Sequence, residues 1–408
     1  YVLIDSIIKI IKRDNTVMDY CVLVFYVFNC FPVLLDYIFG IPNYNSWYFR
    51  LEEAMNDTNV ALIYDIYMLI VLMFFYFYKI LNKRSQEEKK EESIIKKSHR
   101  NILILLCLLP HIYILITGNL TNFLGYESLN SRNIGEISIE LINLFNQISI
   151  IAFSYLYFCA QNVKCNKLIL ILYTLSIWWI DGKRYIVLTT LIIYVFLYIK
   201  SGKMKFDYKR FIKYAVIGIS LFSIFYIIYS QDKMKRVYTT SDSEMSFYAD
   251  FRLNFGRDDV VKFVIKEEFI DKKPILEYRG QSILYDFVMF VPRSLFLNKP
   301  YPHYRYLSAA IYDTNIFDIP SGITPSIFEM GIANFSYLGI ILTPLIMLGI
   351  CKLADTRKSI IQQSIYLVII VNLLTQSLDA AIGFVFILIA MFIYKLTRKK
   401  GTENEVTI

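Results

Sequence analysis

Residues 60–81 read VALIYDIYMLIVLMFFYFYKIL, a segment that is apolar apart from Asp65 near its start and Lys79 near its end. Crossing the ~30 Å hydrocarbon core of a bilayer takes roughly 20 apolar residues in a helix. Further apolar segments of this kind recur along the chain, and 56% of the 408 residues are hydrophobic. A soluble protein would instead alternate polar and apolar residues at a helix or strand period. The sequence therefore predicts an all-α integral membrane protein.

We expect about ten transmembrane helices. A further helix ahead of Tyr1 is an open alternative, because YVLIDSII resembles the end of one. One long polar segment divides the chain into an N-terminal membrane bundle (1–229), a long loop (230–330) and a C-terminal bundle with a tail (331–408). The predicted transmembrane segments are 17–39, 60–81, 101–117, 139–160, 166–181, 185–200, 211–229, 331–351, 360–375 and 377–394.

Lysine and arginine concentrate in alternate short connections, for example within 83–100 and 200–213, and at both ends of the chain. Connections rich in these residues stay on the cytoplasmic side of a membrane. We therefore expect cytoplasmic N- and C-termini and an external loop 230–330. The same bias accounts for the net charge of +8, so this charge does not indicate binding to nucleic acid. The lipid bilayer is the expected partner.

The long loop contains two short segments with helical patterns. Asp258 or Asp259 is suited to cap a helix through VVKFVIKEEF, and the apolar face of that helix predicts packing on the membrane or on the bundle. The following segment 282–292, SILYDFVMFVP, is apolar but too short to span. We expect it to form an interfacial or re-entrant helix that stops at Pro292.

The turn Asp181-Gly182-Lys183-Arg184 places three charges between two apolar segments. Such charges often belong to a loop at the membrane surface whose long side chains extend to the polar headgroups and have no further function. Lys183 and Arg184, however, lie on the predicted external side, against the charge bias. Charges held near membrane depth tend to mark a substrate path. The pattern favours anion binding by Lys183 and Arg184, with Asp181 orienting them.

Three arginines of the long loop, Arg279, Arg293 and Arg305, lie among aromatic residues, prolines and glycines with few acids nearby. Simple solvation explains many loop arginines. Planar guanidinium groups in such surroundings also suit bidentate recognition of phosphate. We therefore expect at least two of these three residues to contact an anionic substrate.

The same loop holds two candidate proton carriers, His303 and Glu329. His303 lies within an aromatic stretch whose tyrosines, Tyr304 among them, can face sugar rings, although such aromatics also anchor loops at membrane interfaces. Glu329 precedes an apolar helix, where a carboxylate either stabilises the helix dipole or acts as a base. For the stretch around His303, a catalytic role and a role in anchoring the loop both stay open. For Glu329, a role as a base and a role in stabilising the helix both stay open.

Two motifs resemble the O-antigen and capsular repeat-unit polymerases of the Wzy type. The segment Phe290–Pro300, FVPRSLFLNKP, is similar to a turn of the form P-R-x-x-x-x-x-K-P in that family. Pro325-Ser326-x-x-Glu329, followed by Asn334-Phe335 and Gly339, resembles the start of a late helix in its members. The turn at Asp181–Arg184 is similar to a short G-x-R turn found in these proteins.

The resemblance implies an enzyme of the bacterial cytoplasmic membrane that polymerises oligosaccharide repeats linked to undecaprenyl diphosphate, on the outer face. It also implies a chain-length regulator and a flippase as partners. A diphosphate leaving group needs positive charge where negative charge develops. The residues expected to be catalytic are Arg293, His303 and Glu329, and those expected to bind diphosphate or sugar are Asp181, Lys183, Arg184, Arg279, Tyr304 and Arg305.

We expect neither a metal nor a cofactor, because the long loop contains no cysteine and no Asp-x-Asp metal motif. Two alternatives to the polymerase remain. One is a ligase-type glycan transferase, and the other is a transporter or flippase of lipid-linked oligosaccharide. A transporter is expected to show internal repeats and broken helices that meet near the middle of the membrane, and the sequence shows no such repeat.

Overall fold

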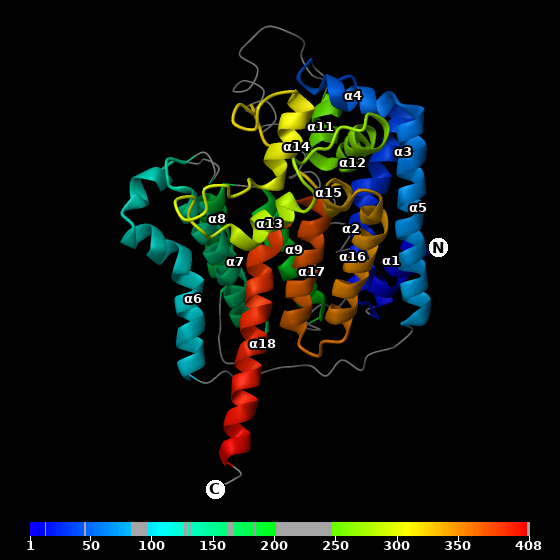
Figure 1. Cartoon of the computed structure of the whole chain (residues 1–408). Coiled ribbons are helices and arrows are strands. Elements are labelled where there is room, and N and C mark those ends of the chain that lie inside the picture. The colour runs from blue at the N-terminus through cyan, green and yellow to red at the C-terminus, as the bar shows by residue number, and fades with distance from the viewer. Residues whose placement is uncertain are drawn as a thin grey trace.

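The computed structural model describes residues 1–12, 14–44, 46–82, 97–125, 129, 132–160, 166–182, 184–200 and 247–405. The described residues form helices and no β-strand (Figure 1). The main helices are α1 (Val2–Lys12), α2 (Val17–Phe25), α3 (Phe31–Phe39), α4 (Phe49–Asn56), α5 (Thr58–Leu81), α6 (Lys97–Ile116), α7 (Glu136–Phe158), α8 (Lys167–Asp181), α9 (Arg184–Lys200), α11 (Phe247–Phe255), α12 (Asp258–Ile265), α13 (Gln281–Val288), α14 (His303–Tyr312), α15 (Ile327–Phe335), α16 (Gly339–Asp355), α17 (Ile360–Thr375) and α18 (Asp379–Glu405).

Five helical segments in the described part are long and apolar enough to cross a membrane. Four of them agree within two residues at each end with the predicted segments 17–39, 60–81, 101–117 and 139–160. The first is continuous because a π-helix, Tyr26–Cys30, joins α2 to α3. The predicted segment 211–229 lies outside the described residues. The fold is therefore that of an all-helical protein compatible with a multi-pass membrane protein.

The predicted segment 331–351 differs from the fifth long apolar segment, which runs from Ile327 to Asp355. The chain bends within it, at a short 3-10 turn that begins at Ser336 with a φ of 54°. The bend brings Gly331 of α15 against Gly339 of α16, and a Cβ on Gly339 would come within 2.1 Å of the Gly331 carbonyl oxygen. The apolar pattern did not reveal this bend, because both halves are equally apolar.

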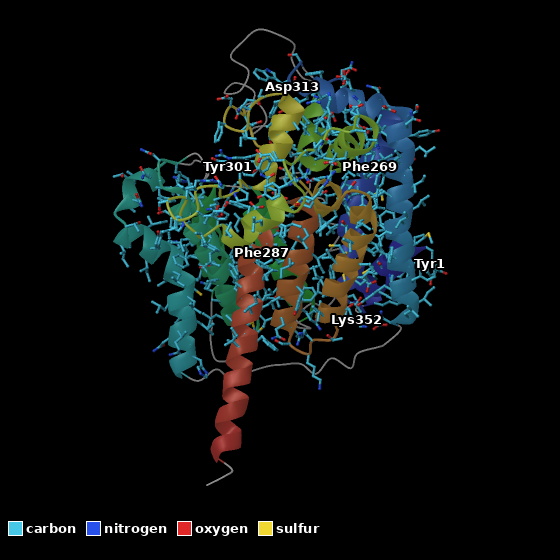
Figure 2. All side chains as sticks on the ribbon, viewed as in Figure 1. Tyr1, Phe269, Phe287, Tyr301, Asp313 and Lys352 are labelled. Atoms are coloured by element: carbon cyan, nitrogen blue, oxygen red, sulfur yellow. The ribbon has the colours of Figure 1, made fainter. Side chains whose placement is uncertain are left out.

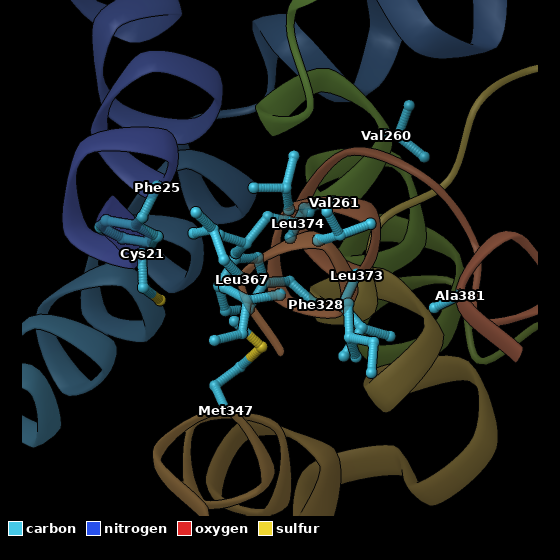
Figure 3. Packing of buried hydrophobic residues seen from close by; sticks show 14 of the residues in the cluster. Cys21, Phe25, Val260, Val261, Phe328, Met347, Leu367, Leu373, Leu374 and Ala381 are labelled. Carbon is cyan, nitrogen blue, oxygen red and sulfur yellow. The ribbon is translucent and has the colours of Figure 1, made fainter. Parts of the chain in front are cut away.

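Helix α17 is the centre of the bundle. It packs against α2, α9, α16 and α18, and 13 of its 16 residues are buried. A helix that is apolar on all sides is stable only where other helices surround it. Figure 3 shows Leu367, Leu373 and Leu374 of α17 beside Phe25 of α2 and Phe328 of α15.

The described part of the long loop, from Phe247 onward, folds onto the bundle. Helix α12 is buried along its whole length and packs against α4, α5 and α15, so the predicted apolar face lies on the bundle. The predicted cap is wrong: Asp258 and Asp259 occupy the first turn, and the residue before the helix is Arg257. Helix α13 covers most of the predicted 282–292 segment and ends before Pro292.

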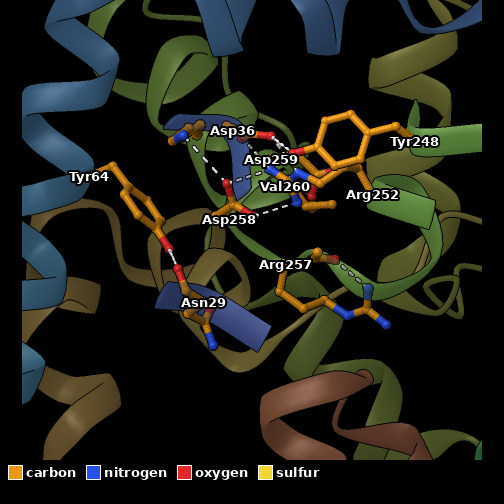
Figure 4. A network of polar contacts seen from close by, with 11 residues as sticks. Asn29, Asp36, Tyr64, Tyr248, Arg252, Arg257, Asp258, Asp259 and Val260 are labelled. Atoms are coloured by element: carbon orange, nitrogen blue, oxygen red, sulfur yellow. Dashed lines mark hydrogen bonds and ion pairs between the residues drawn. The ribbon is translucent and has the colours of Figure 1, made fainter. Parts of the chain in front are cut away.

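A buried ion cluster joins the loop to the first long helix (Figure 4). The side chain of Arg252 is fully buried, and its Nε and Nη2 donate to both carboxylate oxygens of Asp36 at 2.8 and 2.7 Å. The same guanidinium donates to Asp258 at 3.0 and 2.8 Å. Tyr248 also donates to Asp36, at 2.6 Å. One cation thereby binds α3, α11 and α12 together.

Replacing Arg252 with Met should destabilise the protein strongly, because it leaves Asp36 and Asp258 as buried charges without their main cation. Breaking a buried pair in this way costs about 3–5 kcal/mol. The triple variant R252M/D36N/D258N should recover part of the loss, since it also removes the two charges. The apparent unfolding temperature of detergent-solubilised protein measures both effects.

The matched control is Lys9→Met, which removes a cation from the partly exposed pair with Asp5 on α1. Such pairs contribute about 0.3–0.5 kcal/mol, so this variant should unfold close to the wild-type temperature. Equal shifts for Lys9→Met and Arg252→Met would contradict a special role for the buried cluster.

Candidate functional site

A pocket of about 620 Å³ opens at the end of the bundle that carries α14. Figure 2 places Tyr301, one of its lining residues, toward this end, and Lys352 toward the opposite end. Five segments that are far apart in the sequence form the walls. They are residues 139–147 of α7, Tyr285 of α13, residues 301–305 at the start of α14, residues 319–325, and residues 376–380 from the end of α17 to the start of α18.

Arg305 is the cation of this pocket. Its guanidinium carbon lies 5.3 Å from the centre of the Tyr301 ring. Within the described ranges the Arg305 side chain forms no hydrogen bond or ion pair with the protein, so its donors are available to a ligand. Tyr304, the neighbouring predicted residue, also lines the pocket. The structure thus brings two of the predicted binding residues together on one wall.

The opposite wall carries carboxylates and amides that are not among the predicted site residues. Glu140, Asn143 and Gln147 follow one face of α7, and Asp379 begins α18. The Tyr285 hydroxyl donates to Glu140 at 3.2 Å. A signal was present, because Glu140 is an acid within an apolar segment, and such charges tend to be functional. Which of these positions share a pocket depends on the packing of α7 against α18.

Asp286 of α13 lies behind this wall, and only 3% of its surface is exposed. Burial, followed by repulsion from Asp379 and Glu140, raises the pKa of its carboxyl to about 9. Its Oδ2 has no hydrogen-bond partner in the described part of the chain. Asp286 therefore carries a proton at neutral pH beside the two carboxylates of the pocket.

The two predicted proton carriers form one buried network. His303 Nε2 contacts Glu329 Oε2 at 2.8 Å, and His303 Nδ1 contacts the Ser282 hydroxyl at 3.1 Å. Asn334 donates to Ser282 at 2.8 Å, and the Ser326 backbone N–H donates to Glu329 at 2.8 Å. All these side chains are at most 2% exposed. They lie behind the wall that Pro302 and Tyr304 form, so the network holds the start of α14 in place.

The other two predicted arginines are used by the protein itself. Arg279 donates to the Ala333 carbonyl at 2.7 Å and to Glu268 at 2.6 Å. Arg293 donates to the carbonyls of Lys299 and Pro300. Its guanidinium carbon lies 3.9 Å from the centre of the Tyr301 ring. Arg293 thus supports the ring on which Arg305 also rests, whereas Arg279 lines no part of the pocket.

The predicted Asp181–Arg184 turn is only partly described. Asp181 is fully buried at the end of α8, and Asn146 of α7 donates to it at 3.3 Å. Gly182 ends the helix in the left-handed conformation, with a φ of 65°. Lys183 and the side chain of Arg184 lie outside the described residues. Asn146 is next in the sequence to Gln147 of the pocket wall, so Asp181 lies close to the level of Gln147 along α7.

Among the residues that the structure describes, no three or more His, Cys, Asp or Glu side chains are grouped to hold a metal ion. The fold and this pocket are those expected of a helical membrane protein with a polar site at one end of its bundle. No family model, curated protein or solved structure matches the chain.

The raised pKa of Asp286 makes a prediction about stability. Its ordinary value is 3.8 and its folded value is about 9, so between these values the folded protein binds one more proton than the unfolded chain. The free energy of unfolding then falls as pH rises through this window. Asp286→Asn removes that dependence. Its apparent unfolding temperature should exceed that of the wild type increasingly from pH 5 to pH 9.

Asp318→Asn is the control, because the side chain of Asp318 is exposed in the same loop. It should show the wild-type pH dependence. If Asp286→Asn and the wild type lose stability in parallel between pH 5 and pH 9, Asp286 does not hold the extra proton.

Proposed function

We propose that this protein is a membrane glycosyltransferase that polymerises oligosaccharide repeats linked to undecaprenyl diphosphate, as the resemblance of its loop motifs implies. The pocket beside α14 carries the proposal. It combines an uncompensated arginine, three tyrosines and two carboxylates in about 620 Å³. Tyrosine faces and amide side chains suit sugar rings and their hydroxyls, and the guanidinium suits a phosphate.

In the proposed reaction a hydroxyl of the acceptor repeat attacks the anomeric carbon of the donor glycan. A new carbon–oxygen bond forms, the bond from that carbon to the diphosphate oxygen breaks, and its electron pair leaves with the diphosphate. Arg305 stabilises the negative charge that develops on this leaving group. Lys183 and Arg184 are proposed to assist, because Asp181 of their turn accepts a hydrogen bond from Asn146, which is next in the sequence to Gln147 of the pocket wall.

The acceptor hydroxyl must lose a proton during this step. We assign its acceptor to the carboxylate pair Glu140 and Asp379, because both line the pocket. His303 and Glu329 are buried behind the wall and are proposed to position α14 with its Tyr304 and Arg305. Arg293 is proposed to support the Tyr301 ring, and Arg279 to hold the loop against α15.

The proposed topology follows the distribution of lysine and arginine. About ten helices would cross the bacterial cytoplasmic membrane, with both termini in the cytoplasm and the long loop outside. Besides the five long segments, we propose that the shorter apolar helices Ile186–Lys200, Ile360–Thr375 and Asp379–Ile393 also cross the membrane. The pocket would then open on the outer face, and the lipid tail would lie between helices. A chain-length regulator and a flippase are the proposed protein partners.

A transporter is the second candidate. A transport site is expected near the middle of the membrane, and Gln147, which lines the pocket, lies at the middle of the 23-residue helix α7. A transporter is also expected to be built from internal repeats, and the sequence shows none. A ligase-type transferase shares the proposed chemistry and differs in its acceptor.

Purified protein in detergent, supplied with authentic lipid-linked repeats, should produce longer glycans with or without a chelator. No elongation by folded protein would contradict the polymerase. Loss of product upon chelation would contradict the metal-independent mechanism only. Release of glycan onto a different acceptor, without elongation, would identify the ligase-type reaction.

Arg305→Gln should lower the rate of transfer about 10²- to 10³-fold, as expected for the loss of one preorganised group that stabilises a developing charge. The control is Lys273→Gln, an exposed residue of the same loop with the same change in charge, which should leave the rate unchanged. Single-turnover rates at saturating substrate measure both. Equal rates for Arg305→Gln and the wild type would remove Arg305 from the site.

Asp379→Asn and Glu140→Gln separate the two carboxylates. Loss of a general base lowers a rate about 10²- to 10⁴-fold, so one of these variants should fall in that range across the whole pH profile. The other should chiefly raise the KM for the acceptor. If both variants keep the wild-type kcat, the proton acceptor is not in this pocket.

A further inference from the structure

A second hollow lies on the other half of the molecule, independent of the pocket beside α14. It is an apolar groove of about 360 Å³ along α17, between α16 and α18. Most of its lining is aliphatic or aromatic, for example Leu353, Ile369, Val385 and Phe392. The three helices that line it are apolar: α16 belongs to a segment long enough to cross a membrane, and α17 and the first part of α18 are shorter apolar helices.

The polar lining residues gather at one end of this groove. They are Arg357, which follows α16, and Gln362 and Tyr366 in the first two turns of α17. This end is opposite the loop, on the side where Figure 2 shows Lys352. Lys352 and Lys358 are both exposed beside it. The groove is therefore apolar along its length and positively charged at its mouth.

Arg357 is not fully satisfied by the protein. Its guanidinium carbon lies 6.0 Å from the centre of the Tyr366 ring. Its Nε is buried and has no hydrogen-bond partner in the described part of the molecule. The terminal nitrogens of the same guanidinium form no hydrogen bond or ion pair with the described residues, so they are available to an anionic oxygen in the groove.

We propose that this groove binds an anionic glycerophospholipid of the leaflet on that side, with one acyl chain along α17 and the phosphate on Arg357. The apolar length matches the chain, the cation matches the charge, and Gln362 can donate to the phosphate or ester oxygens. A lipid with no net charge would fill the groove equally well, but its ammonium group would lie close to Arg357, Lys352 and Lys358.

Native mass spectrometry of the delipidated protein tests the proposal, with phosphatidylglycerol and phosphatidylcholine titrated separately. The wild type should retain one phosphatidylglycerol more tightly than phosphatidylcholine. Arg357→Gln should weaken phosphatidylglycerol about tenfold, the effect of losing one hydrogen bond between charged groups. Ile389→Trp, which fills the groove from α18, should weaken both lipids.

The matched control is Lys358→Gln, which removes the same charge next to Arg357 at a position that does not line the groove. It should change phosphatidylglycerol binding much less than Arg357→Gln does. Equal losses in the two variants would show attraction to surface charge only and would overturn the site. Equal affinity of the wild type for the two lipids would overturn the assigned role of Arg357. Unchanged unfolding temperatures would show that both variants are folded.

Discussion

The buried contact between Arg252 and the carboxylates of Asp36 and Asp258 is the interaction on which the arrangement of the loop depends. A guanidinium with no exposed surface is tolerated only where anions neutralise it and accept its hydrogen bonds. Here two carboxylates accept four of them, one from the end of the first long helix and one from the start of α12. The loop therefore has one position on the bundle in which all three charges are satisfied.

The consequences of that position extend to the pocket through packed helices. Helix α12 contacts α15, and α15 carries Glu329, which binds His303 at the first turn of α14. The next residues of α14, Tyr304 and Arg305, form a wall of the pocket. The close crossing of α15 and α16 at Gly331 and Gly339 holds α15 against the central bundle. The polar pocket beside α14 is therefore supported by packed apolar helices.

The three loop arginines show how tertiary contacts separate residues that look alike in the sequence. Each lies among aromatic residues, prolines and glycines, yet Arg279 pairs with Glu268 and Arg293 binds two carbonyls of its own loop. Of these three, only Arg305 lines the pocket, and its side chain forms no hydrogen bond with the residues that the structure describes. At the far end of the bundle, Arg357 also has an unsatisfied donor. Functions are proposed for both of these arginines, Arg305 and Arg357.

The sequence by itself determined the helical class and the bounds of most apolar helices, because a backbone in hydrocarbon must satisfy its hydrogen bonds within each helix. It also singled out Arg305, Tyr304, His303 and Glu329. Only the tertiary structure decided that the first two line a pocket while the last two lie behind it, and that Glu140 and Asp379 complete the opposite wall. These residues come from segments far apart in the chain, and no local pattern encodes which of them meet.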